Sequence, residues 1–143
     1  MPWPIPGASS NCNPAAAITE STSIDMAVLT GPNMQNSAGE GVVQFLKNQT
    51  SPTGGINVCV TGHSLGGALA STLALYLLEN QSVWDQSTNS QSTVSAICFA
   101  APSAGNNYFA ENSNTVFANA AAHGSRRACG SHLPLPPRHT PAP

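Results

Sequence analysis

Charged side chains are scarce in this sequence: they make up 7% of its 143 residues, and the net charge is −2. Proteins that bind nucleic acid usually carry a basic patch, and four Lys and Arg residues in all provide no such footprint. So few charges also give little electrostatic steering of a charged partner. We therefore expect no nucleic acid as a partner and a neutral small molecule as the substrate.

Long apolar runs are missing too. Ser, Gly, Asn or Thr interrupts every apolar stretch well before the roughly 18 residues that a transmembrane helix needs, so we expect no transmembrane span. Residues 1–7, MPWPIPG, have neither a basic segment nor a continuous apolar one and are not typical of a signal peptide. The cellular compartment stays open on these patterns.

The cysteines lack the spacing of a metal site. Cys12, Cys59, Cys98 and Cys129 form no CxxC pair and no zinc-ligand pattern, so we expect no metal. Cys59 and Cys98 each lie within an apolar run, which predicts buried free thiols that pack as small hydrophobic side chains rather than a disulfide.

The middle of the chain predicts one βαβ unit. Residues 56–61 form a short β-branched run between glycines, which is typical of a buried strand. Residues 65–80 are apolar on most faces, as in a helix packed inside a layered fold. A polar loop over 86–91 then leads to a second buried-strand pattern over 93–99. Strand, helix, loop and strand in this order predict two parallel strands joined by a right-handed crossover.

Weaker patterns flank this unit. Prolines crowd residues 1–14 and predict a loop there. No helix or strand period is visible after about residue 121, where prolines return, so we predict a folded domain over 1–119 and an irregular tail over 120–143. The remaining patterns predict helices over about 23–29, 37–48 and 104–112 and a third strand over 115–119.

Together these elements predict a three-layer α/β fold with helices packed against a parallel sheet. With about three strands, the sheet would be incomplete. Its outer strands would expose their edges and an apolar face that further strands normally cover. We therefore expect self-association through the exposed sheet edges.

One motif carries chemistry: residues 62–66 read Gly-His-Ser-Leu-Gly, a GxSxG sequence between a predicted strand and a predicted helix. A nucleophile elbow needs this setting, because the sharp, strained turn exposes the serine hydroxyl. Gly62 and Gly66 are expected to be glycine because side chains there would collide across so tight a turn. The N-terminus of the following helix would direct free N–H groups and its positive dipole end toward a developing oxyanion.

Two other interpretations of this turn explain less. Ser64 could merely cap the helix, as in a plain strand-to-helix turn. A phosphate-binding loop of Walker type would need a Lys before the Ser or Thr, and the one lysine is Lys47, on another element. We therefore predict that Ser64 is a nucleophile, and we expect no cofactor.

Beyond the pentapeptide, residues 58–70, VCVTGHSLGGALA, resemble the class 3 lipases, the fungal-lipase-like branch of the α/β-hydrolases. A second segment, residues 101–106 with the sequence APSAGN, resembles the proline turn and Gly-Asn pair that follow the next strand in that family. The two matches together cover about residues 39–119. The resemblance implies an ester hydrolase in which Ser64 attacks the substrate and the backbone N–H of Leu65 is one donor of the oxyanion hole. His63 is expected to support the elbow by packing and hydrogen bonding, because its side chain cannot easily double back onto Ser64.

The chain departs from the family pattern in two places. The second oxyanion donor of such lipases lies in an Arg-Gly-Ser/Thr context, and no such sequence precedes Ser64. The family's triad runs Ser, Asp, His, yet no aspartate follows Asp85, and neither Asp25 nor Asp85 matches the acid position. The order alone is met by weak candidates: Glu111 as acid and His123, His132 or His139 as base.

The composition changes abruptly after Asn119, which predicts a frameshifted or fused end over residues 120–143. Three hypotheses about function are compatible with these patterns. The first is a lipase or carboxylic ester hydrolase that cleaves acylglycerols or other neutral esters through a Ser64 acyl-enzyme. The second is a catalytically incomplete lipase fragment that lacks the family's acid and His. The third is a binding module that reuses the fold, and the intact elbow argues against it.

Overall fold

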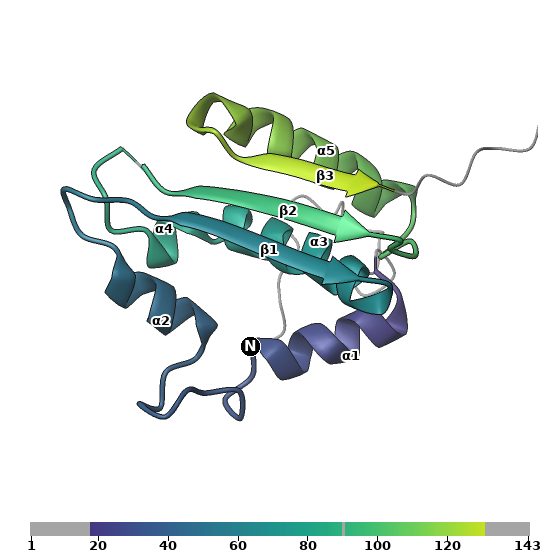
Figure 1. Cartoon of the computed structure of the whole chain (residues 1–143), viewed down its shortest axis with the longest axis horizontal. Coiled ribbons are helices and arrows are strands. Elements are labelled where there is room, and N and C mark those ends of the chain that lie inside the picture. The colour runs from purple at the N-terminus through teal and green to yellow at the C-terminus, as the bar shows by residue number, and fades with distance from the viewer. Residues whose placement is uncertain (1–17, 90, 131–143) are drawn as a thin grey trace, which may run out of the picture.

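The computed structural model describes residues 18–89 and 91–130, and these form an α/β fold around a parallel sheet (Figure 1). The sheet has three strands in the order β1 (Asn57–His63), β2 (Thr93–Phe99) and β3 (Arg126–Gly130). Both neighbouring pairs are parallel. The expected fold class, an α/β fold with an incomplete parallel sheet, is therefore confirmed.

The predicted βαβ unit is present. After β1 come α3 (Leu65–Glu79) and the short α4 (Gln81–Trp84), and the chain then returns to β2. β1 and β2 pair in parallel from Asn57↔Thr93 to His63↔Phe99. The carboxyl ends of both strands therefore lie side by side, at one edge of the sheet that runs across the strands. The segments that leave the two strands are therefore brought together at that edge.

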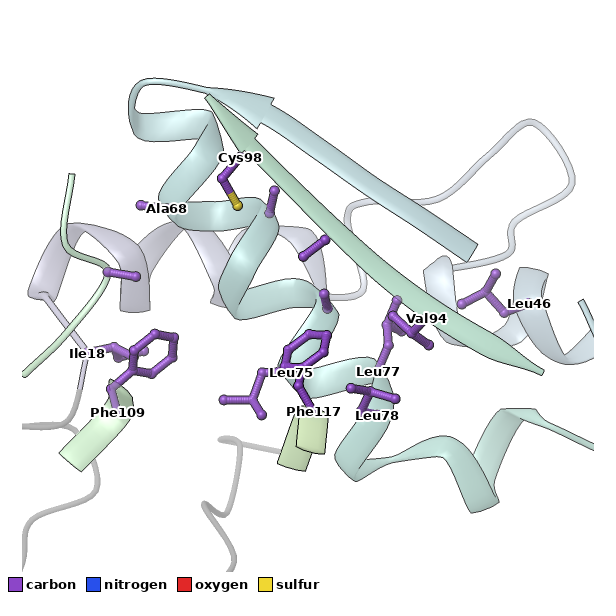
Figure 2. Packing of buried hydrophobic residues seen from close by; sticks show 14 of the residues in the cluster. Ile18, Leu46, Ala68, Leu75, Leu77, Leu78, Val94, Cys98, Phe109 and Phe117 are labelled. Atoms are coloured by element: carbon purple, nitrogen blue, oxygen red, sulfur yellow. The ribbon is translucent and has the colours of Figure 1, made fainter. Parts of the chain in front are cut away.

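The hydrophobic core lies between the sheet and the helices behind it (Figure 2). Alternate residues of β2 are buried, as expected for a strand with one covered face. They pack with buried side chains of α3 and of α5 (Asn107–Ala120). Among the largest contributors to this cluster are Leu75, Leu77, Val94, Phe109 and Phe117.

The predicted third strand over 115–119 is wrong, because these residues belong to α5. The local run is rich in β-branched and apolar residues, but the buried positions Phe109, Ser113 and Phe117 recur every four residues, which is the period of one helix face. Asn106 begins the helix, since its side-chain oxygen accepts a hydrogen bond of 3.1 Å from the Phe109 N–H. Helical packing thus overrode the local preference for a strand.

The third strand lies instead at β3, inside the segment predicted to be an irregular tail. A 3-10 turn over Ala121–His123 and left-handed Gly124 (φ 86°) redirect the chain after α5. Ser125 then accepts a hydrogen bond of 3.0 Å from the Val94 N–H, which fixes the start of the pairing with β2. The prediction of an irregular tail is therefore wrong for β3, and the rest of that tail, residues 131–143, lies outside the described residues.

The first N-terminal helix is longer than predicted, because it begins before residue 23, and the second is shorter and shifted. α1 (Glu20–Leu29) begins at Thr19, whose hydroxyl accepts a hydrogen bond from the Thr22 N–H, and it contacts α3. α2 (Val42–Gln49) starts five residues later than the predicted helix over 37–48. The cause is Asn36, whose side-chain oxygen accepts from the Ala38 and Glu40 N–H groups and closes a turn there.

The face of the sheet away from α3 and α5 is open within the described part of the chain. In Figure 1 the strands lie in front of these two helices. On the open face Phe99 is 57% exposed and Ile97 is 39% exposed. Cys59 also lies on this face and is exposed, so the prediction that its thiol is buried is wrong, whereas Cys98 on the covered face is buried as predicted. Self-association through the sheet edges stays a prediction, which sedimentation velocity of the chain would check.

None of the described helices is both long and apolar enough to cross a membrane.

Candidate active site

Ser64 occupies the bend between β1 and α3, at the edge of the sheet where the strands end. Its backbone angles are φ 55° and ψ −128°, and its side chain is exposed. Positive φ is strained for a residue with a Cβ, and such strain tends to be kept where the structure around it fixes the residue for function. The expected strained bend with an exposed serine is therefore present.

The backbone on both sides holds Ser64 in this conformation. Its N–H donates a hydrogen bond of 2.9 Å to the carbonyl oxygen of Phe99, the last residue of β2. Its carbonyl oxygen accepts from the N–H groups of Gly67 and Ala68, at 2.8 and 3.3 Å. The Ser64 hydroxyl makes no capping hydrogen bond to α3. The interpretation of Ser64 as a plain helix cap therefore does not describe this turn, since only its backbone caps the helix.

Two glycines, Gly62 and Gly67, allow the bend, and only Gly62 is one of the two that the motif suggested. A Cβ on Gly62 would lie 2.0 Å from the Gly66 carbonyl oxygen, so no side chain fits there. A Cβ on Gly67 would lie 2.8 Å from the Ala101 Cβ. A Cβ on Gly66 would meet no described atom within 4 Å apart from its chain neighbours and the backbone of α3, so the expectation of a collision at Gly66 is wrong. Gly66 supplies the backbone that Gly62 must approach, and Gly67 was missed because the pentapeptide pattern does not include it.

Two backbone donors are free at the start of α3. The N–H groups of Leu65 and Gly66 make no hydrogen bond within the described residues, because no helical turn precedes them to supply carbonyl acceptors. Unsatisfied N–H groups and the helix dipole give this end of α3 a partial positive charge. An oxyanion forming beside Ser64 could be stabilised by such donors.

His123 lies near the start of strand β2, whereas Ser64 lies at the end of the same strand. It is exposed in the 3-10 turn before β3, and the neighbouring Gly124 lies against Thr93, the first residue of β2. Ser64 instead pairs with the last residue of β2. The seven residues of β2 span about 20 Å, so His123 is out of reach of the Ser64 hydroxyl.

Glu111 is also remote from Ser64. It is exposed on α5, and the next residue, Asn112, donates a hydrogen bond of 2.9 Å to Glu79, the last residue of α3. Ser64 precedes the first residue of this 15-residue helix, which is about 20 Å long. The structure therefore brings neither of the two described weak triad candidates to Ser64, and His132 and His139 lie outside the described residues.

Neither the remaining aspartates nor His63 makes a hydrogen bond to Ser64 within the described residues. Asp25 lies on α1, and His63, the last residue of β1, is exposed on the open face of the sheet. Asp85 is buried near the start of β2. One of its carboxylate oxygens accepts a hydrogen bond of 3.1 Å from the N–H of Ser92, the residue before that strand. Asp85 therefore has a structural role in the loop between α4 and β2.

Asp85 organises the loop that leads into β2. One oxygen accepts from the N–H and hydroxyl of Ser87, at 3.0 and 2.5 Å, and the other accepts from the Gln81 amide at 3.1 Å. Burial raises the pKa of Asp85, but the hydrogen bonds from Ser87, Gln81 and Ser92 together bring the pKa below its ordinary value. The ionised form is therefore favoured by folding.

We expect Asp85→Asn to lower the free energy of unfolding by about 1–3 kcal/mol at pH 7, because an amide nitrogen would face donors that now meet a carboxylate oxygen. Since the pKa is lowered in the folded state, the stabilisation is present above the ordinary carboxyl pKa of about 4 and is lost as pH falls through the lower folded value. Urea unfolding at pH 7 and pH 3 checks this, with the exposed Glu111→Gln as control. An equal difference in the free energy of unfolding between Asp85→Asn and wild type at pH 7 and at pH 3 would show that the ionised carboxylate of Asp85 does not stabilise the fold.

The fold and the site together define a class. A parallel α/β sheet with an exposed serine on a strained strand-to-helix bend is the arrangement of the α/β-hydrolases. Residues 10–125 match the family Lipase (class 3), and the chain therefore belongs to the class 3 lipases.

A solved relative supports the same assignment. The crystal structure of M37 lipase is 34% identical in sequence, with a TM-score of 0.57. The match covers 72% of this chain and 30% of that lipase, so this chain corresponds to less than a third of the length of its solved relative. No curated protein matches the chain.

Proposed function

We propose that this chain is a lipase-type ester hydrolase that uses Ser64 as a nucleophile on acylglycerols or other neutral esters. One observation carries the proposal: the Ser64 side chain is exposed at a bend with positive φ, next to the free N–H groups of Leu65 and Gly66. A nucleophile and oxyanion donors at one helix terminus are the parts that acyl transfer requires.

The chemistry is built from these parts. The Ser64 oxygen forms a bond to the ester carbonyl carbon while its proton passes to a base, and the carbonyl oxygen becomes an oxyanion near the Leu65 N–H. Collapse of this intermediate breaks the bond to the alkoxy oxygen, which takes up a proton and leaves as the alcohol. Water then attacks the acyl-enzyme and releases the acid, restoring Ser64.

The surroundings favour an apolar, uncharged substrate. Leu65, directly after the nucleophile, is 45% exposed, and Phe99, whose carbonyl holds the Ser64 N–H, also presents an exposed side chain. Charged residues are few in the whole sequence. An acyl chain would cover these exposed apolar side chains, whereas a charged substrate would find little to pair with.

A second candidate function is a catalytically incomplete lipase fragment. It is favoured because Glu111 and His123 lie far from Ser64, and because the chain corresponds to 30% of its solved relative. Such a fragment would keep the elbow but lack the base that activates the serine, so it would turn over slowly. Rapid reaction of Ser64 with an electrophile that mimics an ester is therefore predicted by the first candidate only.

The test of the proposal is covalent labelling by a fluorophosphonate, which reacts with activated serines. We expect one label per chain, on Ser64 by mass spectrometry, lost in Ser64→Ala and kept in Ser82→Ala, an exposed serine on α4 as matched control. Labelling at several serines at equal rates, or undiminished labelling of Ser64→Ala, would show that Ser64 is not activated and would sink the proposal.

A further inference from the structure

Gly66 is a glycine without a packing reason among the described residues. Gly66 does not have a positive φ, unlike Gly39 and Gly124. Its backbone conformation is therefore open to any residue. Apart from its chain neighbours and the backbone of α3, a Cβ there would meet no described atom within 4 Å. Glycine in a helix nevertheless costs about 1 kcal/mol relative to alanine. The two usual reasons for a glycine, positive φ and close approach, are therefore both missing at this position.

The neighbouring glycines differ from Gly66 in their surroundings. A Cβ on Gly62 would lie 2.0 Å from backbone, and one on Gly67 would lie 2.8 Å from the Ala101 side chain. Three glycines within six residues thus fall into two groups: two allow the chain to pack, and one leaves open space beside the nucleophile.

The open space at Gly66 lies at the nucleophile end of α3. In a helix the Cα–Cβ bond tilts toward the N-terminus, so a side chain at Gly66, the second residue of α3, would extend toward the helix end that carries Ser64. The free N–H groups of Leu65 and Gly66 lie at the same end. A side chain there would therefore narrow the space next to the position of the substrate carbonyl.

We infer that Gly66 determines specificity: by having no side chain, it leaves room for a long acyl group of the ester next to Ser64. This inference rests on the proposed function. The acyl group is bonded to the carbonyl carbon that Ser64 attacks, so it must pass close to the end of α3, and the exposed Leu65 offers it an apolar surface. A short acetyl group ends before it reaches this space.

The experiment uses two fluorophosphonates with the same leaving group, one with a methyl and one with an octyl group on phosphorus, where the acyl chain would be. The labelling rate of Ser64 is measured for the full-length wild type, Gly66→Ala and Gly66→Val. We expect Gly66→Ala to lower the octyl-to-methyl rate ratio about tenfold or more, since one methyl group in a pocket changes discrimination by about 10- to 200-fold. Gly66→Val should lower the ratio further, and the melting temperature of Gly66→Ala should be unchanged or a few degrees higher.

Several results would overturn the inference. An unchanged rate ratio, or equal losses for both probes, would show that the space is not used by the acyl group. A lower melting temperature of Gly66→Ala would show that a part of the chain outside the described residues packs on Gly66. Absence of Ser64 labelling in the wild type by either probe would overturn the proposed function itself, which is a distinct outcome from an unchanged ratio.

Discussion

Gly62→Ala is expected to destroy the bend that presents Ser64, lowering the free energy of unfolding by about 3 kcal/mol or more. The added Cβ would lie 2.0 Å from the Gly66 carbonyl oxygen, 2.3 Å from its carbonyl carbon and 2.8 Å from the Gly67 nitrogen. All three are backbone atoms, so no side-chain rotation relieves the overlap. The end of β1 and the first turn of α3 would have to move apart, which breaks the backbone hydrogen bonds around Ser64.

Urea unfolding followed by circular dichroism measures this effect, and Gly66→Ala is the matched control because it adds the same methyl group in the same turn with no described neighbour within 4 Å. We expect the control to unfold at or above the wild-type midpoint. If Gly62→Ala unfolds at the same urea concentration as the wild type, the close approach of β1 to α3 is not a feature of the protein in solution.

The βαβ unit could be predicted from the sequence because its local patterns agree with its tertiary packing. The apolar helix after Ser64 buries its side chains against the sheet, and the observed strands and helix lie within a residue or two of their predicted ranges. The prediction that the first strand is buried is wrong, because the residues of β1 alternate between exposed and half-buried. The strained bend at Ser64 was expected from the same pattern. A segment can be predicted from its sequence when local preference and global packing agree.

The errors have a common physical cause, which is that long-range contacts decided the outcome. Residues 115–119 are strand-like alone, but Phe117 belongs to a buried helix face together with Phe109. β3 has no apolar period of its own and is recognised only through its pairing with β2. The role of Gly67 depends on Ala101, which is 34 positions away in the sequence and adjacent in space.

One of the weak triad candidates, His123, could have been excluded by topology. In a parallel sheet, residues that follow strands gather at one edge and residues that precede strands gather at the other. Ser64 follows β1, whereas Asp85 and His123 precede β2 and β3. Knowing that β3 begins at residue 126 would have placed His123 at the wrong edge, but no period in the sequence marks that strand.

Hydrolysis by this chain is expected to be weak, because the described residues supply the proposed nucleophile and oxyanion donors but bring no acid and base to them. In serine hydrolases that have lost triad members, a residual acceleration of about 10³ to 10⁴ over water remains, owed to the oxyanion hole and to binding. We therefore expect slow hydrolysis of short, activated esters and hardly any hydrolysis of emulsified triglyceride. The low rate should be proportional to protein concentration and should fall to the background in Ser64→Ala.

The measurement compares wild type and Ser64→Ala on a short p-nitrophenyl ester and on a long-chain triglyceride, with His132→Ala and His139→Ala assayed alongside. Those two histidines lie outside the described residues, so each is still a candidate for the base. The two candidate functions differ in whether the chain supplies a base, and the histidine variants therefore distinguish them. Rapid triglyceride hydrolysis that is lost in Ser64→Ala and in one of the histidine variants would show that the C-terminal residues provide the base, and the incomplete-fragment alternative would be wrong. Equal slow hydrolysis by wild type and Ser64→Ala would instead show that the bend is formed but takes no part in the reaction, because the remaining rate would then owe nothing to the serine oxygen.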